Sequence, residues 1–228
     1  MHDQQADLEW RDSGVPVSNQ FDDPYFSLDN GLEETRHVFL TGNELPTRFC
    51  DGFHIGELGF GTGLGFLTAV HAWIASETKG HLYFTSFEAF PMTDLEMERA
   101  LSAFPELAEL AVPLVRHWGA NLQPIQYAPN ITLNVIMGDA RETLPQWHGK
   151  ADAWFLDGFS PAKNPELWTP ELMQAVVDNT AADGTAATYT AAGFVRRGLS
   201  DACFHVQRIK GYGRKRHMTV AQFGVSVT

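Results

Sequence analysis

A dense cluster of glycines between an apolar strand and an apolar helix restricts this chain more than any other feature of its sequence. The run from Glu57 to Gly65 reads E-L-G-F-G-T-G-L-G and ends a buried strand expected over residues 53–58. Glycines let a backbone turn tightly and approach a ligand closely, and the helix expected over residues 64–76 presents free N–H groups behind them. Strand, glycine loop and helix together predict a ligand-binding turn in an α/β domain.

The rest of the chain continues this alternation. Further strands are expected over residues 82–87, 131–137, 153–156 and 185–190, and a terminal antiparallel pair over residues 204–209 and 218–225. Helices are expected over residues 32–40, 94–104 behind the cap Thr93, 105–112, 172–179 and 194–202. The order predicts a doubly wound α/β domain, a mostly parallel sheet with helices on both faces and a C-terminal hairpin. We assign this domain to residues 52–228 and expect residues 1–51 to be an extension packed on it.

Length and composition exclude several classes of protein. The 228 residues suit one domain with a real core. The first twenty residues lack the basic and apolar regions of a signal peptide, and no apolar run approaches the ~20 residues of a membrane span. The two cysteines, Cys50 and Cys203, form no CxxC pair, and the nine histidines show no metal-ligand spacing. We therefore expect a cytoplasmic protein without a metal site or a membrane partner.

Two carboxylates follow the next two long strands. Because ligands in such sheets bind beyond the carboxyl ends of the strands, Glu88 and Asp139 are expected at one site. Glu88 can accept both hydroxyls of a ribose, and Asp139, in Gly138-Asp139-Ala140, can accept a hydrogen bond from an adenine amine. Either residue alone is more often a helix cap, but behind a glycine loop the two together favour an adenosine site.

The spacing of the loop narrows the kind of cofactor. It lacks the Lys-Ser/Thr ending of a P-loop, and G-x-G-x-G differs from the G-x-G-x-x-G of dinucleotide sites. The loop resembles the first motif of class I methyltransferases, whose S-adenosylmethionine has no phosphate. The residues expected to bind this cofactor are Glu57, Gly59, Gly61, Thr62, Gly63, Glu88, Asp139 and Ala140.

Asp157 follows the next buried strand, in L-D-G-F-S-P. In amine-directed methyltransferases this position carries a polar residue followed closely by an aromatic residue and a proline. An aliphatic ammonium has a pKa near ~10, so about one molecule in a thousand is neutral at pH 7, a handicap of roughly 4 kcal/mol. A carboxylate beside the nitrogen can orient it and accept its proton, and Phe159 can stack on a planar ring that carries the amine. The alternative is that Asp157 caps the following turn.

The positive charge of this acidic chain is concentrated near its end. The net charge is −12, yet residues 196–217 hold seven basic residues against one acid, Asp201, while the rest holds nine basic and 27 acidic residues. The seven are Arg196, Arg197, Arg208, Lys210, Arg214, Lys215 and Arg216. Such asymmetry indicates either a polyanion-binding face or a solvated turn between surface strands.

Six stretches together resemble one family, the methyltransferase half of the bifunctional bacterial enzyme that makes 5-methylaminomethyl-2-thiouridine at the tRNA wobble position. They lie at residues 21–27, 31–36, 59–63, 152–165, 192–199 and 211–216, and D-G-F-x-P-A-K-N-P within the fourth is the most specific. The resemblance implies a class I fold, S-adenosylmethionine as donor, tRNA as partner and Asp157 beside the reacting aminomethyl nitrogen. The resemblance also implies that the following residues contact the substrate: Phe159, Lys163, Arg196, Arg197, Arg214, Lys215 and Arg216.

The chain departs from this family in one respect, and two other functions remain open. The flavin-dependent half of the bifunctional enzyme is absent, so we expect no FAD and an upstream wobble-uridine-modifying enzyme acting in trans. A small-amine methyltransferase or an aminopropyltransferase-like enzyme would use the same fold with an acidic pocket, and would give the basic stretch no role. A non-catalytic module that binds tRNA or cofactor would have no use for Asp157.

Overall fold

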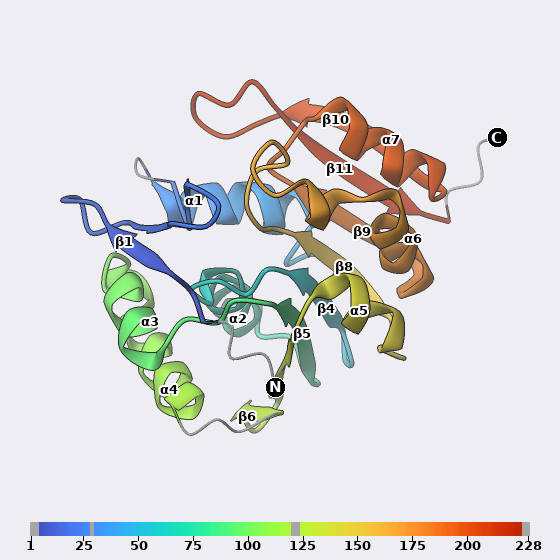
Figure 1. Cartoon of the computed structure of the whole chain (residues 1–228). Helices are drawn as coiled ribbons and strands as arrows, with labels where there is room; N and C mark the ends of the chain where they lie inside the picture. The colour runs from blue at the N-terminus through green and yellow to red at the C-terminus, as the bar shows by residue number, and fades with distance from the viewer. Residues whose placement is uncertain (1–4, 28–29, 120–123, 225–228) are drawn as a thin grey trace.

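A computed structural model describes residues 5–27, 30–119 and 124–224, which centre on one eight-stranded sheet (Figure 1). The strand order is β10-β11-β9-β8-β4-β5-β7-β6. The neighbours from β9 to β7 run parallel, whereas β6 and the β10–β11 hairpin pair antiparallel at the two ends. The strands are β4 (His54–Leu58), β5 (Leu82–Glu88), β6 (Ile125–Ala128), β7 (Ile131–Met137), β8 (Ala151–Leu156), β9 (Thr180–Thr188), β10 (Phe204–Lys210) and β11 (His217–Phe223).

The order of the central strands creates the crevice expected from the sequence. Strands β4 and β8 lie side by side, and from them the chain winds outward in opposite directions. Both strands are mostly apolar, as expected where both faces of a strand are covered, and Ile55, Leu58 and Phe155 are fully buried. A ligand in such a sheet binds beyond the carboxyl ends of these two strands, where the winding reverses.

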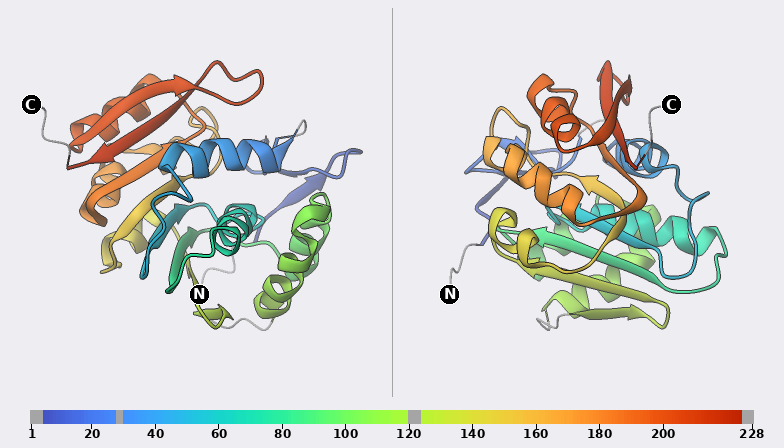
Figure 2. Two further views of the ribbon diagram at one scale, coloured as in Figure 1. Left: turned by 180° about the vertical axis from the view of Figure 1, so that it is seen from behind. Right: turned by 90° about the vertical axis from the view of Figure 1, so that its right-hand side faces the viewer.

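Helices cover both faces of the sheet, as the alternation predicts (Figures 1 and 2). Strand residues alternate between two apolar cores, so that Phe155 belongs to the core beneath α2 and Trp154 to the core beneath α6 and α7. The helices are α1 (Gly31–Thr35), continued by a π-helix over Arg36–Leu40, α2 (Leu64–Ala75), α3 (Asp94–Leu101), α4 (Ala108–Gly119), α5 (Ala140–Thr143), α6 (Pro170–Asp178) and α7 (Gly193–Asp201). No helix of the described residues is both long and apolar enough to cross a bilayer.

The N-terminal residues contact the body at several points. Strands β1 (Leu8–Trp10), β2 (Pro16–Ser18) and β3 (Asp23–Pro24) form a small antiparallel sheet of their own. Beyond α1, Phe39 stacks on Phe155 with ring centroids 5.0 Å apart. The buried amide of Asn43 donates to the carbonyl oxygen of Trp154 at 3.2 Å. These contacts join the N-terminal residues to the centre of the sheet.

Several boundaries differ from those predicted, among them that of β9, which was expected over residues 185–190 but spans Thr180–Thr188. The helix from Pro105 was expected to end at Val112, before Pro113, but it runs to Gly119 after a 3-10 turn, because Leu114 and Trp118 are buried against the body. The helix behind Thr93 ends at Leu101, three residues early. Strand β6 was not predicted, since it is a four-residue edge strand with a bulge. Val225, expected in the last strand, lies outside the described residues.

Candidate active site

A pocket of about 840 Å³ opens at the carboxyl ends of the central strands. Its walls come from separate parts of the sequence: residues within 20–27 and 31–39 before the first central strand, the glycine loop, the ends of β5 and β7, residues within 157–167 after β8, and single residues beyond. The volume is that of a site for a drug-sized or larger ligand. The predicted position of the site, at the strand ends beside β4 and β8, is therefore where the structure has a cavity large enough for such a ligand.

The glycine loop forms one wall through its unusual backbone. Gly59, Gly61 and Gly63 have φ angles of +81°, +53° and +78°, a region that side-chain-bearing residues rarely adopt. A Cβ atom at Gly59 would lie 3.2 Å from the Cα of Gly158, so two backbones meet closely here. Phe60 stacks on Trp118 of α4 with centroids 5.0 Å apart and holds the loop from behind.

The predicted cofactor residues separate into those that face the pocket and those that support it. Gly59, Gly61, Thr62, Glu88, Asp139 and Ala140 line the cavity, whereas Glu57 and Gly63 do not. Gly63 is instead the N-cap residue, directly before helix α2. Glu57 is 1 % exposed beneath the loop and accepts a hydrogen bond from the hydroxyl of Ser86 at 2.7 Å. Burial raises the pKa of Glu57 well above its usual range.

Glu88 and Asp139 stand in different surroundings. Glu88 is nearly buried, and its carboxylate accepts backbone N–H groups of Gly61 at 2.8 Å and Phe90 at 2.7 Å. Burial raises the pKa of Glu88, although the backbone N–H groups around it favour the ionised form. Asp139 caps α5, accepting the N–H of Arg141 at 2.9 Å, and forms an ion pair with the same arginine.

Asp157 lies directly after β8, half-buried in the wall of the pocket. Its Oδ1 accepts the backbone N–H of Gly158 at 2.8 Å. Burial raises the pKa of this carboxyl to about 7, although the Gly158 N–H and the ammonium of Lys215 both favour the ionised form. A carboxyl that titrates near neutrality and faces a cavity has the properties of an acid–base group.

The segment before α1 closes one side of the pocket against the loop after β8. Phe159 stacks on Phe21 with centroids 4.7 Å apart and meets Tyr25 edge-on at 5.0 Å. The N–H of Ser160 donates to Asp23 at 2.7 Å. Phe21 therefore covers one face of the Phe159 ring. The stacking of Phe159 on a substrate ring stays a prediction that concerns the rest of its ring.

The predicted basic residues do not act as one group. Lys163 forms an ion pair with Asp22 at 2.7 Å and does not line the pocket. Arg197, Arg214 and Arg216 are exposed, and Arg196 donates weakly to the carbonyl of Ala191 at 3.4 Å. Lys215 alone lines the pocket.

Sequence reasoning did not single out several residues that line the same cavity. These are Phe21, Tyr25, Glu34 and Tyr189. Glu34 and the two aromatic residues near the N-terminus lie in stretches that carry the family resemblance, which was the available signal. Tyr189 follows β9, and the carboxyl end of a neighbouring strand was the signal for it. Among the described residues, no group of His, Cys, Asp and Glu side chains could hold a metal ion.

Comparison with known proteins agrees with this geometry. Residues 105–223 match the model of a family described as S-adenosyl-L-methionine-dependent methyltransferase. The chain is 46% identical to the "tRNA 5-methylaminomethyl-2-thiouridine biosynthesis bifunctional protein MnmC" of Aeromonas hydrophila and 47% identical to that of Aliivibrio fischeri. These alignments cover 95% and 93% of this chain but 35% and 34% of the relatives, so the chain spans about a third of their length.

A solved structure shares the whole fold. The crystal structure titled MNMC2 from Aquifex aeolicus superposes with a TM-score of 0.76 at 25% identity, covering 99% of this chain and 73% of the other. The family match and this superposition confirm the predicted fold, a Rossmann-like class I methyltransferase with a mostly parallel sheet and a C-terminal hairpin.

Proposed function

We propose that this chain, which belongs to the S-adenosyl-L-methionine-dependent methyltransferase family, methylates the 5-aminomethyl nitrogen of a wobble uridine or 2-thiouridine in tRNA. The product would be the 5-methylaminomethyl nucleoside in the names of the Aeromonas and Aliivibrio relatives. One observation carries the proposal: Asp157, whose pKa burial raises to about 7, faces the same cavity as the glycine loop and Glu88. A tRNA substrate implies an enzyme of the cytoplasm, and an upstream enzyme that supplies the aminomethyl group.

The residues of the pocket fit the cofactor of this family. Gly59 and Gly61 add no side chains of their own to the wall of the cavity, and the Glu88 carboxylate lines the same cavity. We assign the ribose hydroxyls to Glu88 and the adenine edge to the region of Asp139 and Ala140. When bound, S-adenosylmethionine supplies an electrophilic methyl group on a sulfonium.

Asp157 prepares the amine. A substrate ammonium with a pKa near ~10 has no free lone pair, so it must lose a proton before the nitrogen can accept a methyl group. The Asp157 carboxylate accepts this proton, and its raised pKa, about 7, brings the two groups closer in proton affinity than an exposed carboxylate would. The chain thereby supplies a base that is still partly ionised at neutral pH.

The test is methyl transfer from labelled cofactor to tRNA that carries 5-aminomethyluridine at the wobble position, followed by mass spectrometry of the nucleosides. We expect 5-methylaminomethyluridine, and we expect Asp157→Ala to lower turnover by about 10²- to 10⁴-fold, the usual contribution of a positioned acid–base group. Binding of S-adenosylhomocysteine should persist in the variant. The same tRNA with unmodified uridine is the control.

Two outcomes would contradict the proposal. Methylation of a polyamine in place of the tRNA would assign the pocket to the small-amine alternative. Cofactor binding without transfer to any of these acceptors would indicate a binding module.

A further inference from the structure

The mechanism above does not use one ion pair that lines the pocket. Glu34, from α1, places its Oε1 2.7 Å from the Nζ of Lys215, from the turn between β10 and β11. Both residues line the pocket. The Glu34 side chain is only 12 % exposed, whereas that of Lys215 is 48 % exposed. An enclosed carboxylate is thus neutralised by a cation that still reaches solvent.

An aromatic face completes the surroundings of this ammonium. The Nζ of Lys215 lies 4.5 Å from the centroid of the Tyr189 ring, within the range of a cation–π contact. The Tyr189 hydroxyl donates to the carbonyl oxygen of Gly158 at 2.8 Å, which fixes the ring beside the residue that follows Asp157. The carboxylate of Glu34 and the ring of Tyr189 therefore contact one ammonium, in the wall of the cavity that Asp157 also lines.

We propose that Glu34, together with the ring of Tyr189, binds the ammonium of the substrate's aminomethyl group, and that Lys215 occupies this position until the substrate displaces it. A carboxylate beside an aromatic face recognises alkylammonium ions, and the lysine side chain is itself an alkylammonium. This inference rests on the proposed function, because it assigns the amine of that substrate to a subsite.

The exchange keeps every charge paired. Lys215 lies between Arg214 and Arg216 on a turn where nucleic-acid phosphates are its alternative partners, so a docking tRNA can take the lysine while the substrate ammonium takes Glu34. An ammonium has three N–H donors. Glu34 accepts one hydrogen bond and Asp157 takes one proton, which frees the lone pair of the nitrogen while the contact to Glu34 is kept.

The experiment compares two dissociation constants for each protein: one for tRNA with 5-aminomethyluridine and one for the same tRNA with uridine. The Kd for the uridine tRNA divided by the Kd for the 5-aminomethyluridine tRNA measures recognition of the amine and cancels general affinity for tRNA. We expect Glu34→Gln to reduce the ratio by about tenfold or more, the value of one hydrogen bond to a charged group. An unchanged thermal shift with S-adenosylhomocysteine verifies that the variant is folded.

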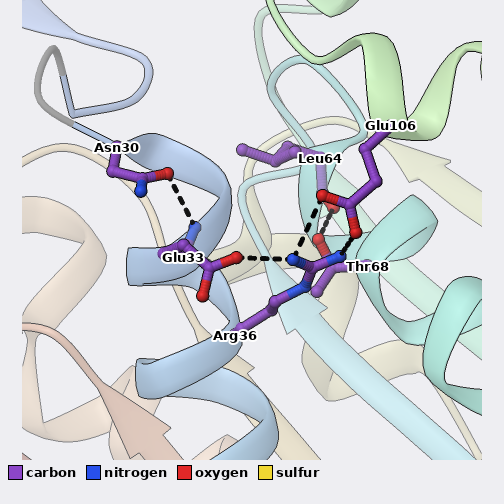
Figure 3. Close-up of polar contacts among 6 residues, drawn as sticks. All are labelled: Asn30, Glu33, Arg36, Leu64, Thr68 and Glu106. Carbon is purple, nitrogen blue, oxygen red and sulfur yellow. Dashed lines mark hydrogen bonds and ion pairs between the residues drawn. The ribbon is translucent and has the colours of Figure 1, made fainter.

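Glu33→Gln is the matched control. Glu33 is the preceding residue of α1, but its carboxylate pairs with Arg36, which also contacts Glu106, outside the pocket (Figure 3). This variant should keep the ratio of the wild type. An unchanged ratio in Glu34→Gln, with an active wild type, would overturn the inference alone.

Lys215→Met tests the place-holder. If the lysine only occupies the subsite, its removal leaves the ratio equal or higher; a ratio as low as that of Glu34→Gln would mean that Lys215 itself recognises the substrate and would overturn the exchange. A wild type that neither transfers methyl groups nor prefers the modified tRNA would overturn the proposed function, and this inference with it.

Discussion

The carboxyl of Asp157, the proposed base, also predicts a pH dependence of stability. Burial raises its pKa from 3.8 to about 7, so the folded protein binds this proton more tightly than the unfolded chain does. The free energy of unfolding therefore falls as pH rises from about 4 to 7. Above pH 7 it is lowered by the full cost of ionising this carboxyl in the folded protein. We expect Asp157→Asn, which cannot ionise, to have a higher melting temperature than the wild type at pH 8.

The low-pH end of the same measurement is the control for this prediction. Below pH 4 both proteins carry a neutral side chain at this position, so the difference in melting temperature should shrink to a small constant. A difference that is equal at pH 4 and at pH 8 would show that ionisation of Asp157 has no cost in the fold.

Gly65 is required for a steric reason. A Cβ atom at this position would lie 2.2 Å from the Oε1 of buried Glu57. We expect Gly65→Ala to lower the free energy of unfolding by about 1–3 kcal/mol, the usual cost of overpacking. In the Gly65→Ala background, Glu57→Ala should lower the free energy of unfolding by less than it does in the wild type, because the two positions are in contact. Denaturant unfolding of the four proteins of this cycle measures the coupling.

Gly198 provides the comparison for that variant. It lies inside α7, where a Cβ would meet Met173 at an ordinary 3.4 Å. Gly198→Ala should therefore be neutral or stabilise by about 0.5–1 kcal/mol, as alanine does in a helix. Equal losses of stability in Gly65→Ala and Gly198→Ala would show that the contact with Glu57 is not the cause.

At the scale of elements, the strands followed from the sequence more closely than the helices did. Strands β4, β5, β7 and β8 are short apolar runs that end at glycine or a carboxylate, and both signals are local. The end of α4 is set by distant contacts: Trp118 stacks on Phe60 and donates to the carbonyl oxygen of Met92 at 2.8 Å. Such packing continues a helix beyond Pro113, where propensity alone predicts its end.

We therefore expect Pro113 to lower the free energy of unfolding by a measurable amount. It lies inside α4, where proline removes one backbone hydrogen bond and crowds the preceding turn. We expect Pro113→Ala to raise the free energy of unfolding by about 1 kcal/mol or more, less than the full ~3 kcal/mol because proline also restricts the unfolded chain. Denaturant unfolding measures the change. A loss of stability would indicate that the fold needs the bend at this residue to bury Leu114 and Trp118.

At the scale of the whole molecule, the alternation of elements predicted the edge of the sheet where the site lies but not all of its walls. The residues at strand ends, such as Glu88 and Asp157, were found from that rule. The segment that closes the pocket carries no periodic pattern, and its position depends on tertiary contacts such as Phe21 on Phe159. The inward position of Lys215 likewise depends on Glu34, which is remote in sequence. The division at residue 51 stays a prediction.

The uneven charge of the molecule leads to the last prediction. A chain of net charge −12 repels a polyanion, so we expect the proposed tRNA substrate to dock where the exposed Arg214 and Arg216 of the β10–β11 turn lie. Arg214→Ala with Arg216→Ala should weaken tRNA binding and flatten its log–log salt dependence by about 1.5 units, since each lost phosphate contact removes somewhat under one. The melting temperature should barely move. Lys79→Ala with Lys150→Ala removes the same charge before β5 and β8, at the opposite edge of the sheet, and should keep the slope. Equal slopes in all three proteins would mean that tRNA docks elsewhere.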